Sequence, residues 1–272
     1  MMIDMQASVH PTALVAPGAR IGAGAKIGPF CTVGPDVRIG DGAELVSHVA
    51  VDGVTRIGAG VKIFPFATVG LAPQDLKYKG EATETEIGPR TMIREHCSIH
   101  RGTATGSGIT RIGADCLLMA VVHVAHDCVV GDRVIVSNNV VMGGHVAIGA
   151  GAVVGGAVAI HQFVRVGAGA MVGGMSGIPA DVVPYSVVFG ARARLAGINA
   201  VGLKRRGLDR AGLHRVRAGF NVLFSEQGVL AERIARVRAA YGDDPYIAEI
   251  LEFIAQPTSR GLIIQRSRST DD

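Results

Sequence analysis

The first two-thirds of the chain repeat one aliphatic position every six residues, with mostly small or polar residues between. The repeated positions run in phase from Val9 to Ile99 and then, shifted by one residue, from Ile112 to Ile178. A period of six matches neither an α-helix, at about 3.6 residues, nor an alternating strand, at about 2. It is typical of a hexapeptide solenoid, in which each repeat is one short strand and one turn.

Stacking these repeats predicts a mainly β protein, built as a parallel β-helix. Three repeats close one triangular coil, so residue i lies beneath residue i+18 on the next coil, about 4.8 Å away. The aliphatic residue points inward, and the small residue after it, often Gly, relieves crowding or takes a positive φ at the bend. Polar segments near residues 71–86 and 101–111 interrupt the count, and we expect both to be external loops. The first has whole-repeat length, because Ile87 resumes in phase.

The repeat ends after Pro184, and residues 209–255 show helical periodicity instead. We therefore expect two domains, a β-helix at residues 1–190 and a C-terminal domain of three or four helices at residues 191–272. The helical domain also covers the open end of the solenoid, which would otherwise expose an unpaired strand edge.

Composition narrows the class of protein. Aromatic residues make up only 4% of the chain and Trp is absent, so the core must consist of Val, Ile, Ala and Leu. The four cysteines form no CxxC pair, which favours free thiols in a reducing compartment. The N-terminus lacks a signal-peptide pattern, and the longest apolar stretch is shorter than the roughly 18–20 residues that span a bilayer. We expect a cytoplasmic protein without a transmembrane segment.

Charge is distributed unevenly along the chain. Residues 192–272 carry 14 Lys and Arg against 9 Asp and Glu, whereas residues 1–191 carry 13 against 14. A basic end suits an acidic partner, and it is equally compatible with an ordinary solvated helical surface.

Four of the nine histidines, at positions 123, 126, 145 and 161, lie close together in the solenoid. The 18-residue coil places His126, Gly144 and Gln162 in one column and His145 above Asp127, all within about 10 Å along the axis. An imidazole can take a proton from a hydroxyl group, and a Gly N–H can approach a developing oxyanion closely. This is the geometry that acyl transfer needs, although spacing alone does not say which histidine is the base. Clustered imidazoles could instead hold zinc.

Several strings closely resemble one enzyme family over nearly the whole chain. They include QDLKY (residues 74–78), IHRGT (99–103), AHDC (125–128), GGHV (143–146), HQF (161–163) and GLKRRG (202–207). The chain resembles the acyl-carrier-protein:UDP-N-acetylglucosamine O-acyltransferases, which begin lipid A synthesis. The resemblance implies a left-handed β-helix, a homotrimer with active sites between neighbouring solenoids, and acyl carrier protein and UDP-N-acetylglucosamine as partners. It implies no metal, no cofactor and no nucleic acid.

The resemblance also assigns roles by position. His126 becomes the general base for the glucosamine 3-hydroxyl, the N–H of Gly144 stabilises the oxyanion, and Asp127 orients His126. Arg192 and Gly174 correspond to positions that limit acyl length. The remaining substrate contacts implied are Asp75, Lys77, His100, His123, His145, His161 (near the acyl entrance) and Gln162, with Asn199, Arg205 and Arg206 at the uridine and phosphate end.

Three alternatives remain beside this interpretation. The related N-acyltransferase usually has an additional N-terminal uridine-binding domain, for which repeats beginning at Val9 leave no room. A zinc-dependent enzyme similar to hexapeptide carbonic anhydrases would use the clustered histidines as ligands. A solenoid without catalytic activity would leave QDLKY and those histidines unexplained. Two positions depart from the family, Arg192 where His is common and Val201 where an acidic residue is common.

Overall fold

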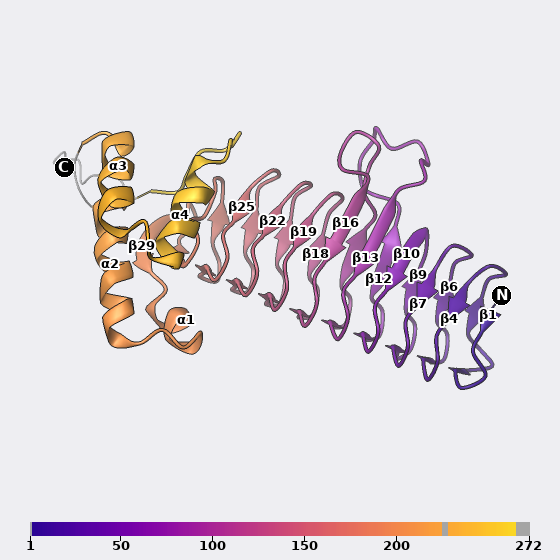
Figure 1. Cartoon of the computed structure of the whole chain (residues 1–272). Coiled ribbons are helices and arrows are strands. Elements are labelled where there is room, and N and C mark those ends of the chain that lie inside the picture. Colours follow the sequence, from indigo (N-terminus) through magenta and orange to yellow (C-terminus); the bar gives the residue numbers. More distant parts are fainter. Residues whose placement is uncertain (1, 225–227, 265–272) are drawn as a thin grey trace.

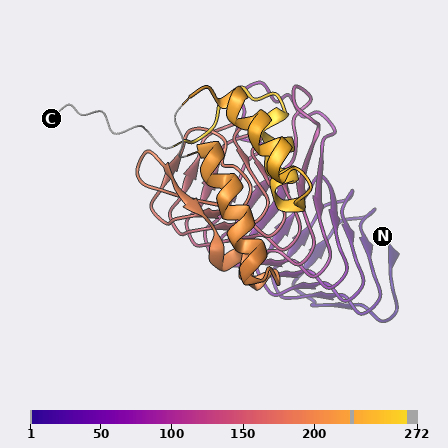
Figure 2. The ribbon, with the colours of Figure 1, turned by 60° about the vertical axis from the view of Figure 1, so that its left-hand side comes forward.

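The computed structural model describes residues 2–224 and 228–264, and it shows a triangular solenoid followed by a small group of helices (Figure 1). Short strands stack coil upon coil from the N-terminus, and the helices lie across the far end of the stack (Figure 2). Within residues 2–224 and 228–264, none of the helices has the length and apolar character needed to cross a membrane.

Three sheets form the faces of the prism, and their strands are parallel except for the last pair. The first sheet contains β1 (Met2–Ile3), β4 (Arg20–Ile21), β7 (Arg38–Ile39), β10 (Val54–Ile57), β13 (Glu84–Ile87), β16 (Ile109–Ile112), β19 (Val129–Val130), β22 (Ala147–Ile148) and β25 (Arg165–Val166). The second contains β2 (Ser8–Val9), β5 (Lys26–Ile27), β8 (Glu44–Leu45), β11 (Lys62–Ile63), β14 (Met92–Ile93), β17 (Leu117–Leu118), β20 (Ile135–Val136), β23 (Val153–Val154), β26 (Met171–Val172), β28 (Ser186–Phe189) and β29 (Arg194–Ile198). The third contains β3 (Leu14–Val15), β6 (Thr32–Val33), β9 (Ala50–Val51), β12 (Thr68–Leu71), β15 (Ser98–His100), β18 (His123–Val124), β21 (Val141–Met142), β24 (Ala159–Ile160) and β27 (Gly177–Ile178).

The observed register confirms the six-residue count and both interruptions. Val124 pairs with Met142, one coil of 18 residues further on. Ile57 pairs with Ile87, so the loop between β12 and β13 adds whole repeats and leaves the phase unchanged. Ile99 pairs with Val124, which accounts for the shift by one residue across the loop between β15 and β16. Both loops project from the same part of the solenoid (Figure 1).

The core consists of the repeated aliphatic residues together with a second inward position, two residues before each. All four cysteines occupy this second position, where they are buried and free. Burial raises the pKa of Cys97 to about 11 and that of Cys128 to about 12, so neither thiol is a nucleophile near neutral pH.

Close packing explains the glycines that follow the aliphatic residues. A Cβ at Gly28 would lie 1.8 Å from the carbonyl oxygen of Val46 on the next coil, so this position relieves crowding. The positive φ falls two residues later, where non-Gly residues such as Phe30 (φ 59°) often stand. Of the two roles expected for the small residue, the first is therefore the one seen at Gly28.

The helices begin after β29, which still belongs to the second sheet although it lies beyond residue 190. They are α1 (Ala200–Arg205), α2 (Arg210–Phe224), α3 (Leu230–Tyr241) and α4 (Pro245–Ala255), as many as the periodicity predicts. Their inward faces pack together through Val216, Phe220, Val237 and Ile250, which are buried. The division into two domains at residue 190 stays a prediction, and residues 225–227 and 265–272 lie outside the described residues.

Candidate active site

The turns that join the third sheet to the first stack into one corner of the prism, which we call the site corner. It carries Asp127, His145 and Phe163, at φ 60°, 63° and 66°. Successive turns are joined by backbone hydrogen bonds, from His145 N to His126 O (3.0 Å) and from Phe163 N to Gly144 O (3.0 Å). The columns expected from the 18-residue coil are therefore present.

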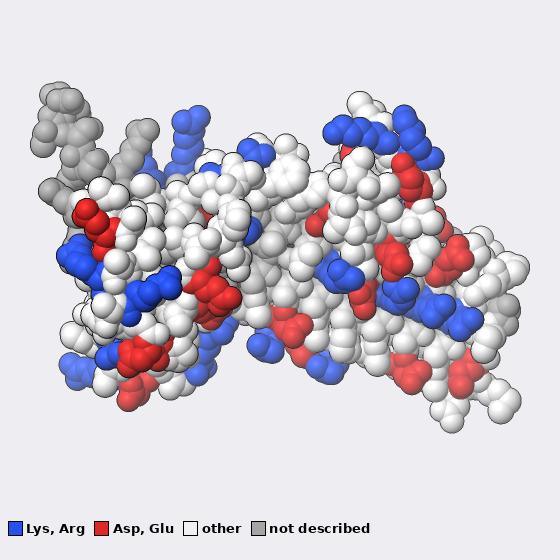
Figure 3. Space-filling view, turned by 45° about the horizontal axis from the view of Figure 1, so that its top comes forward, with Lys and Arg blue, Asp and Glu red and all other residues white. Residues whose placement is uncertain are grey.

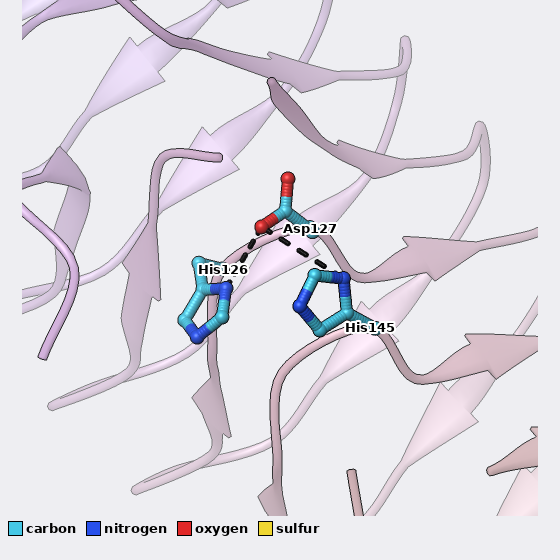
Figure 4. Close-up of side chains that lie close together, drawn as sticks. All are labelled: His126, Asp127 and His145. Carbon is cyan, nitrogen blue, oxygen red and sulfur yellow. Dashed lines mark hydrogen bonds and ion pairs between the residues drawn. The ribbon is translucent and has the colours of Figure 1, made fainter. Parts of the chain in front are cut away.

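His126 and Asp127 form a hydrogen-bonded pair at this corner (Figure 4). The Nδ1 atom of His126 lies 2.8 Å from Oδ2 of Asp127. An alternation of side chains along a strand would point these neighbours apart. They meet because both belong to a turn and Asp127 has a left-handed backbone conformation. The contact between His126 and Asp127 therefore exists because the geometry of a strand does not apply to these residues.

The external loop between β15 and β16 surrounds the carboxylate of Asp127 with donors. Thr103 donates through its hydroxyl (2.6 Å) and its N–H (3.2 Å), Ser107 through its hydroxyl (3.1 Å) and Gly108 through its N–H (3.0 Å). Asp127 is buried, and burial alone would raise its pKa, but the hydrogen bonds from Thr103 and His126 bring the pKa below its usual value. Asp127 is therefore ionised at neutral pH.

An ionised Asp127 fixes the tautomer of His126. A carboxylate only accepts hydrogen bonds, so Nδ1 of His126 must carry the proton that is donated to Oδ2. In the neutral form of this imidazole, Nε2 carries no proton and can act as a base. A Cβ built on Gly144 would lie 2.7 Å from Nε2, which shows how closely the backbone of Gly144 approaches this nitrogen.

The N–H of Gly144 has no hydrogen-bond acceptor within residues 2–224 and 228–264. The same turn position is Pro17 and Pro35 on earlier coils of the solenoid, and Pro has no N–H. The fold therefore does not use this amide, which leaves it available to a bound group beside His126.

His145 shares Asp127 with His126. Its Nδ1 lies 3.9 Å from Oδ2 of Asp127, and its ring meets that of His126 edge-on, with centroids 5.0 Å apart (Figure 4). Burial lowers the pKa of His145, while the negative charges of Asp127 and Asp75 oppose that effect. The loop between β12 and β13 thus brings Asp75 close enough for its charge to act on the site corner.

Two further predicted histidines of this region lie on the third sheet. His123 points outward from β18 and its Nδ1 lies 2.7 Å from the hydroxyl of Ser98. His100, at the end of β15, is buried with its ring edge-on to that of His123. Burial, reinforced by His123 and His126, lowers the pKa of His100 to about 4, so it is neutral near pH 7.

Other predicted contacts are more exposed. His161 and Gln162 lie on the next coil of the site corner, where Nδ1 of His161 is 3.2 Å from the carbonyl oxygen of Gln162. Lys77 is exposed, and its N–H binds Asp75 in the loop between β12 and β13. Figure 3 shows Lys and Arg at the tip of the projecting loops, whereas over the helices both signs of charge are mixed on this face.

The predicted uridine and phosphate residues lie at a different corner, where the first sheet joins the second. Asn199 caps α1 and donates to the carbonyl oxygen of Gly169 (2.9 Å). Arg206 donates to the carbonyl oxygen of Ala150 (2.8 Å) and lies over the Tyr185 ring, and Arg205 is exposed. Within a single chain, these residues are therefore separated from His126 by the width of the first sheet.

Gly174 and Arg192 lie toward the helical end of the third sheet. Gly174 is exposed, and a Cβ there would lie 3.2 Å from the carbonyl oxygen of Gly156. Arg192 is exposed between β28 and β29, and the N–H of Ala193 beside it donates to the carbonyl oxygen of Gly177 (2.9 Å).

The sequence reading assigned no role to Thr103, Ser107, Phe163 or Arg260, although all four take part in this corner. The available signal was the Gly-, Thr- and Ser-rich composition of residues 101–110, which is suited to bonding a carboxylate. Nothing in the spacing of the sequence indicated Arg260, because it comes from a segment 98 residues away from its bonding partner Gln162.

Three side chains of the site could together hold a metal ion. Ligand atoms of His126, Asp127 and His145 all lie within 4.8 Å of one another. However, both oxygens of Asp127 already accept hydrogen bonds from Thr103 and neighbouring groups, which leaves little lone-pair capacity for a metal. The geometry favours a hydrogen-bonded acid–base cluster.

Comparison with known proteins identifies the family. Residues 181–263 match the family model described as UDP N-acetylglucosamine O-acyltransferase, domain 2, and residues 18–53 and 109–144 match the bacterial transferase hexapeptide model. An acyl-[acyl-carrier-protein]–UDP-N-acetylglucosamine O-acyltransferase of Caulobacter vibrioides is 45% identical over 257 residues, covering 94% of this chain and 98% of the relative. The chain belongs to this O-acyltransferase family.

Solved structures of the family agree with this assignment. The UDP-N-acetylglucosamine acyltransferase of Campylobacter jejuni is 36% identical, with a TM-score of 0.90 over 95% of this chain and all (100%) of that one. The UDP-N-acetylglucosamine O-acyltransferase of Moraxella catarrhalis is 39% identical, with a TM-score of 0.85 over 97% of this chain and 100% of that one. The protein is therefore an acyltransferase enzyme, and the predicted left-handed parallel β-helix with C-terminal helices is confirmed.

Proposed function

We propose that the protein transfers an (R)-3-hydroxyacyl group from acyl carrier protein to the glucosamine 3-hydroxyl of UDP-N-acetylglucosamine, as the first step of lipid A synthesis. The observation that carries this proposal is the His126–Asp127 pair beside the unused N–H of Gly144. The names of the relatives supply the substrate classes. A base and an oxyanion donor lie side by side, as transfer between a thioester and a hydroxyl requires.

The proposed reaction uses His126 first as a base and then as an acid. Nε2 of His126 takes the proton of the 3-hydroxyl while its oxygen attacks the thioester carbonyl, and Asp127 stabilises the imidazolium through Nδ1–H. The N–H of Gly144 donates to the oxyanion of the tetrahedral intermediate. Collapse then breaks the carbon–sulfur bond, and His126 returns the proton to the pantetheine sulfur. General-base catalysis contributes about 10²–10⁴-fold and an oxyanion donor about 10²–10³-fold.

We propose that the enzyme works as a homotrimer. The residues expected at the uridine end, Asn199 and Arg206, lie across the first sheet from His126, so a second copy has to complete the site. Exposed apolar side chains follow the corner between the second and third sheets, including Phe30 (57% exposed) and Phe66 (52%). Contact along that corner would place the second sheet of one copy facing the third sheet of the next.

The third sheet offers a path for the acyl chain. Its outward positions become smaller along the axis, from His123 through Val141 and Ala159 to Gly177. This row leads from the site corner toward Arg192, with Gly174 exposed on the adjoining turn. Such a graded row supports the expectation that Gly174 and Arg192 limit acyl length.

The direct test is a transfer assay with purified protein, UDP-N-acetylglucosamine and a panel of 3-hydroxyacyl carrier proteins. We expect one ester product at the 3-hydroxyl, with a preference for one chain length. Absence of transfer with every donor, or transfer only to the amino group of a 3-O-acylated sugar nucleotide, would reject the proposal. Metal analysis of the same sample tests the alternative of a zinc-dependent enzyme. Stoichiometric zinc that is needed for activity would favour that alternative.

A second assay tests the acyl path. Gly174→Met adds a long side chain at an exposed position on the proposed groove, so the preferred chain should become shorter by several carbons. The measurement is the ratio of kcat/KM across the donor panel for the two proteins. An unchanged length profile would remove Gly174 from the groove.

A further inference from the structure

The chain after α4 returns to the site corner. The N–H of Asp181 donates to the carbonyl oxygen of Gly261 (2.9 Å), and the N–H of Ile263 donates to that of Asp181 (2.8 Å). Ile263 is buried, and Asp181 is itself buried and bonded to Arg165. These contacts fix the position of Arg260 beside the last turns of the solenoid.

Arg260 extends the stack of rings at the site corner. Its Nε donates to the carbonyl oxygen of Gln162 (2.9 Å), and its guanidinium carbon lies 5.8 Å from the centroid of the Phe163 ring. The Phe163 ring is parallel to that of His145, at 4.4 Å and 4°. The next position of this column, Asp181, is bonded to Arg165 instead, so Arg260 supplies the group that follows Phe163.

We propose that Arg260 is a positioning residue, which holds Phe163 flat against His145 and thereby fixes the imidazole that shares Asp127 with the base His126. The inference rests on the proposed function for its catalytic consequence, but not for the contacts themselves. A guanidinium over an aromatic face is attracted by the ring, and its bond to a carbonyl oxygen limits its rotation. Arg260 thus acts on the site through Phe163.

The charge of His145 explains why its position matters. The charged or titratable groups that face it are Asp127, His126 and Asp75, with Arg260 beyond the Phe163 ring. A protonated His145 would compete for Oδ2 of Asp127 and place a second positive charge beside His126. Burial lowers the pKa of His145, and the Phe163 ring provides part of that burial. Loss of Arg260 would free the ring, expose His145 and favour its protonation.

The test compares Arg260→Ala with Arg215→Ala. Arg215 is a matched control, because it too lies over an aromatic ring, in this case one in the helical region. Its guanidinium carbon is 5.7 Å from the centroid of the Tyr241 ring. In Arg260→Ala, NMR titration of labelled histidines should show His145 protonated at higher pH, with a shift of about half to one pH unit. The acidic limb of the kcat profile should move the same way, lowering kcat up to about tenfold below neutral pH and leaving it near normal at alkaline pH. KM for the sugar nucleotide should change little.

Three further single variants and one double variant test the route of the effect. Arg260→Lys keeps a cation that can lie over Phe163 and should recover part of the wild-type profile, whereas Arg260→Gln should not. Phe163→Leu should produce the same shift as Arg260→Ala, and the double variant should add nothing more. A second, additive shift would contradict action through Phe163.

The outcomes separate this inference from the proposed function. If wild-type protein transfers no acyl group, the proposed function fails. The titration of His145 still tests whether Arg260 affects the protonation of that histidine. If Arg260→Ala lowers only the melting temperature, and His145 titrates as in wild type and Arg215→Ala, then Arg260 has a purely structural role and the proposal is overturned.

Discussion

Two corners of the solenoid carry stacked rings, and only one of them, within residues 2–224 and 228–264, has the side chains that we propose for catalysis. On the aromatic corner, between the second and third sheets, Phe30, His48, Phe66 and His96 stack with centroids 4.9–5.0 Å apart. On the site corner, His145 stacks on Phe163 and meets His126 edge-on. Both stacks follow from the same 18-residue coil, which places equivalent turn residues one above another.

The difference lies in what the rest of the chain adds to each stack. The site corner receives a buried carboxylate, Asp127, which the loop between β15 and β16 surrounds with donors, and it receives Arg260 from the C-terminal segment. Within residues 2–224 and 228–264, no carboxylate is hydrogen bonded to a ring of the aromatic corner. A histidine in a solenoid turn is therefore a packing residue by default, and becomes a candidate base where a fixed anion orients it.

The largest expected effect separates the two corners by activity. His126→Ala removes the proposed base and should lower kcat by about 10³-fold, within the usual range for general-base catalysis, without disturbing assembly. His48→Ala, on the aromatic corner, should change kcat by no more than about twofold. Steady-state kinetics and sedimentation of both variants check this. Near-normal turnover by His126→Ala would remove the distinction between the corners.

The sequence predicted the solenoid almost completely because one residue in six determines its register. The aliphatic series from Val9 to Ile178, with its shift before Ile112, corresponds to the observed pairing throughout. The column of His126 and Gly144 followed from the same arithmetic. What could not be predicted depends on segments outside the repeat, since no period relates Thr103 or Arg260 to residue 127.

The second prediction concerns Gly144, which precedes the stacked His145. Gly144→Ala would place a Cβ 2.5 Å from Cε1 of His126, so the imidazole or the free N–H must shift. We expect about 10²-fold lower kcat, comparable to loss of one oxyanion donor. Gly156→Ala, at the matching position of the corner between the second and third sheets, meets only the carbonyl oxygen of Asn138 at 3.4 Å and should keep kcat nearly unchanged. Equal losses in both variants would point to general damage to the coil.

A third prediction compares a buried histidine of the site region with an exposed one of the aromatic corner. The pKa of His100 is lowered from 6.5 to about 4, mainly by burial, so the folded protein binds fewer protons than the unfolded chain between these values. The stability that neutral His100 provides is complete above about pH 6.5 and is lost as pH falls toward 4. His100→Asn should therefore reduce the fall in melting temperature between pH 7 and 4.5 by about 2–4 °C, whereas the control His96→Gln should keep the wild-type slope. Parallel slopes in all three proteins would contradict this reading of His100.

The smallest expected effect lies in the aromatic corner itself. Phe66→Ala removes one ring from the middle of the stack, where it contacts His48 and His96, and aromatic pairs contribute about 0.5–1.5 kcal/mol beyond the area they bury. Because Phe66 is 52% exposed in the single chain, this loss should be near the lower limit unless the corner is covered in the proposed trimer. Sedimentation across a dilution series distinguishes these cases, since a covered ring makes the variant dissociate at higher concentration than wild type. In either case kcat of the assembled enzyme should be unchanged, because in the described part of the chain Phe66 has ring contacts with His48 and His96, and neither of these is hydrogen bonded to Asp127. A fall in kcat at full assembly would show that the two corners are coupled.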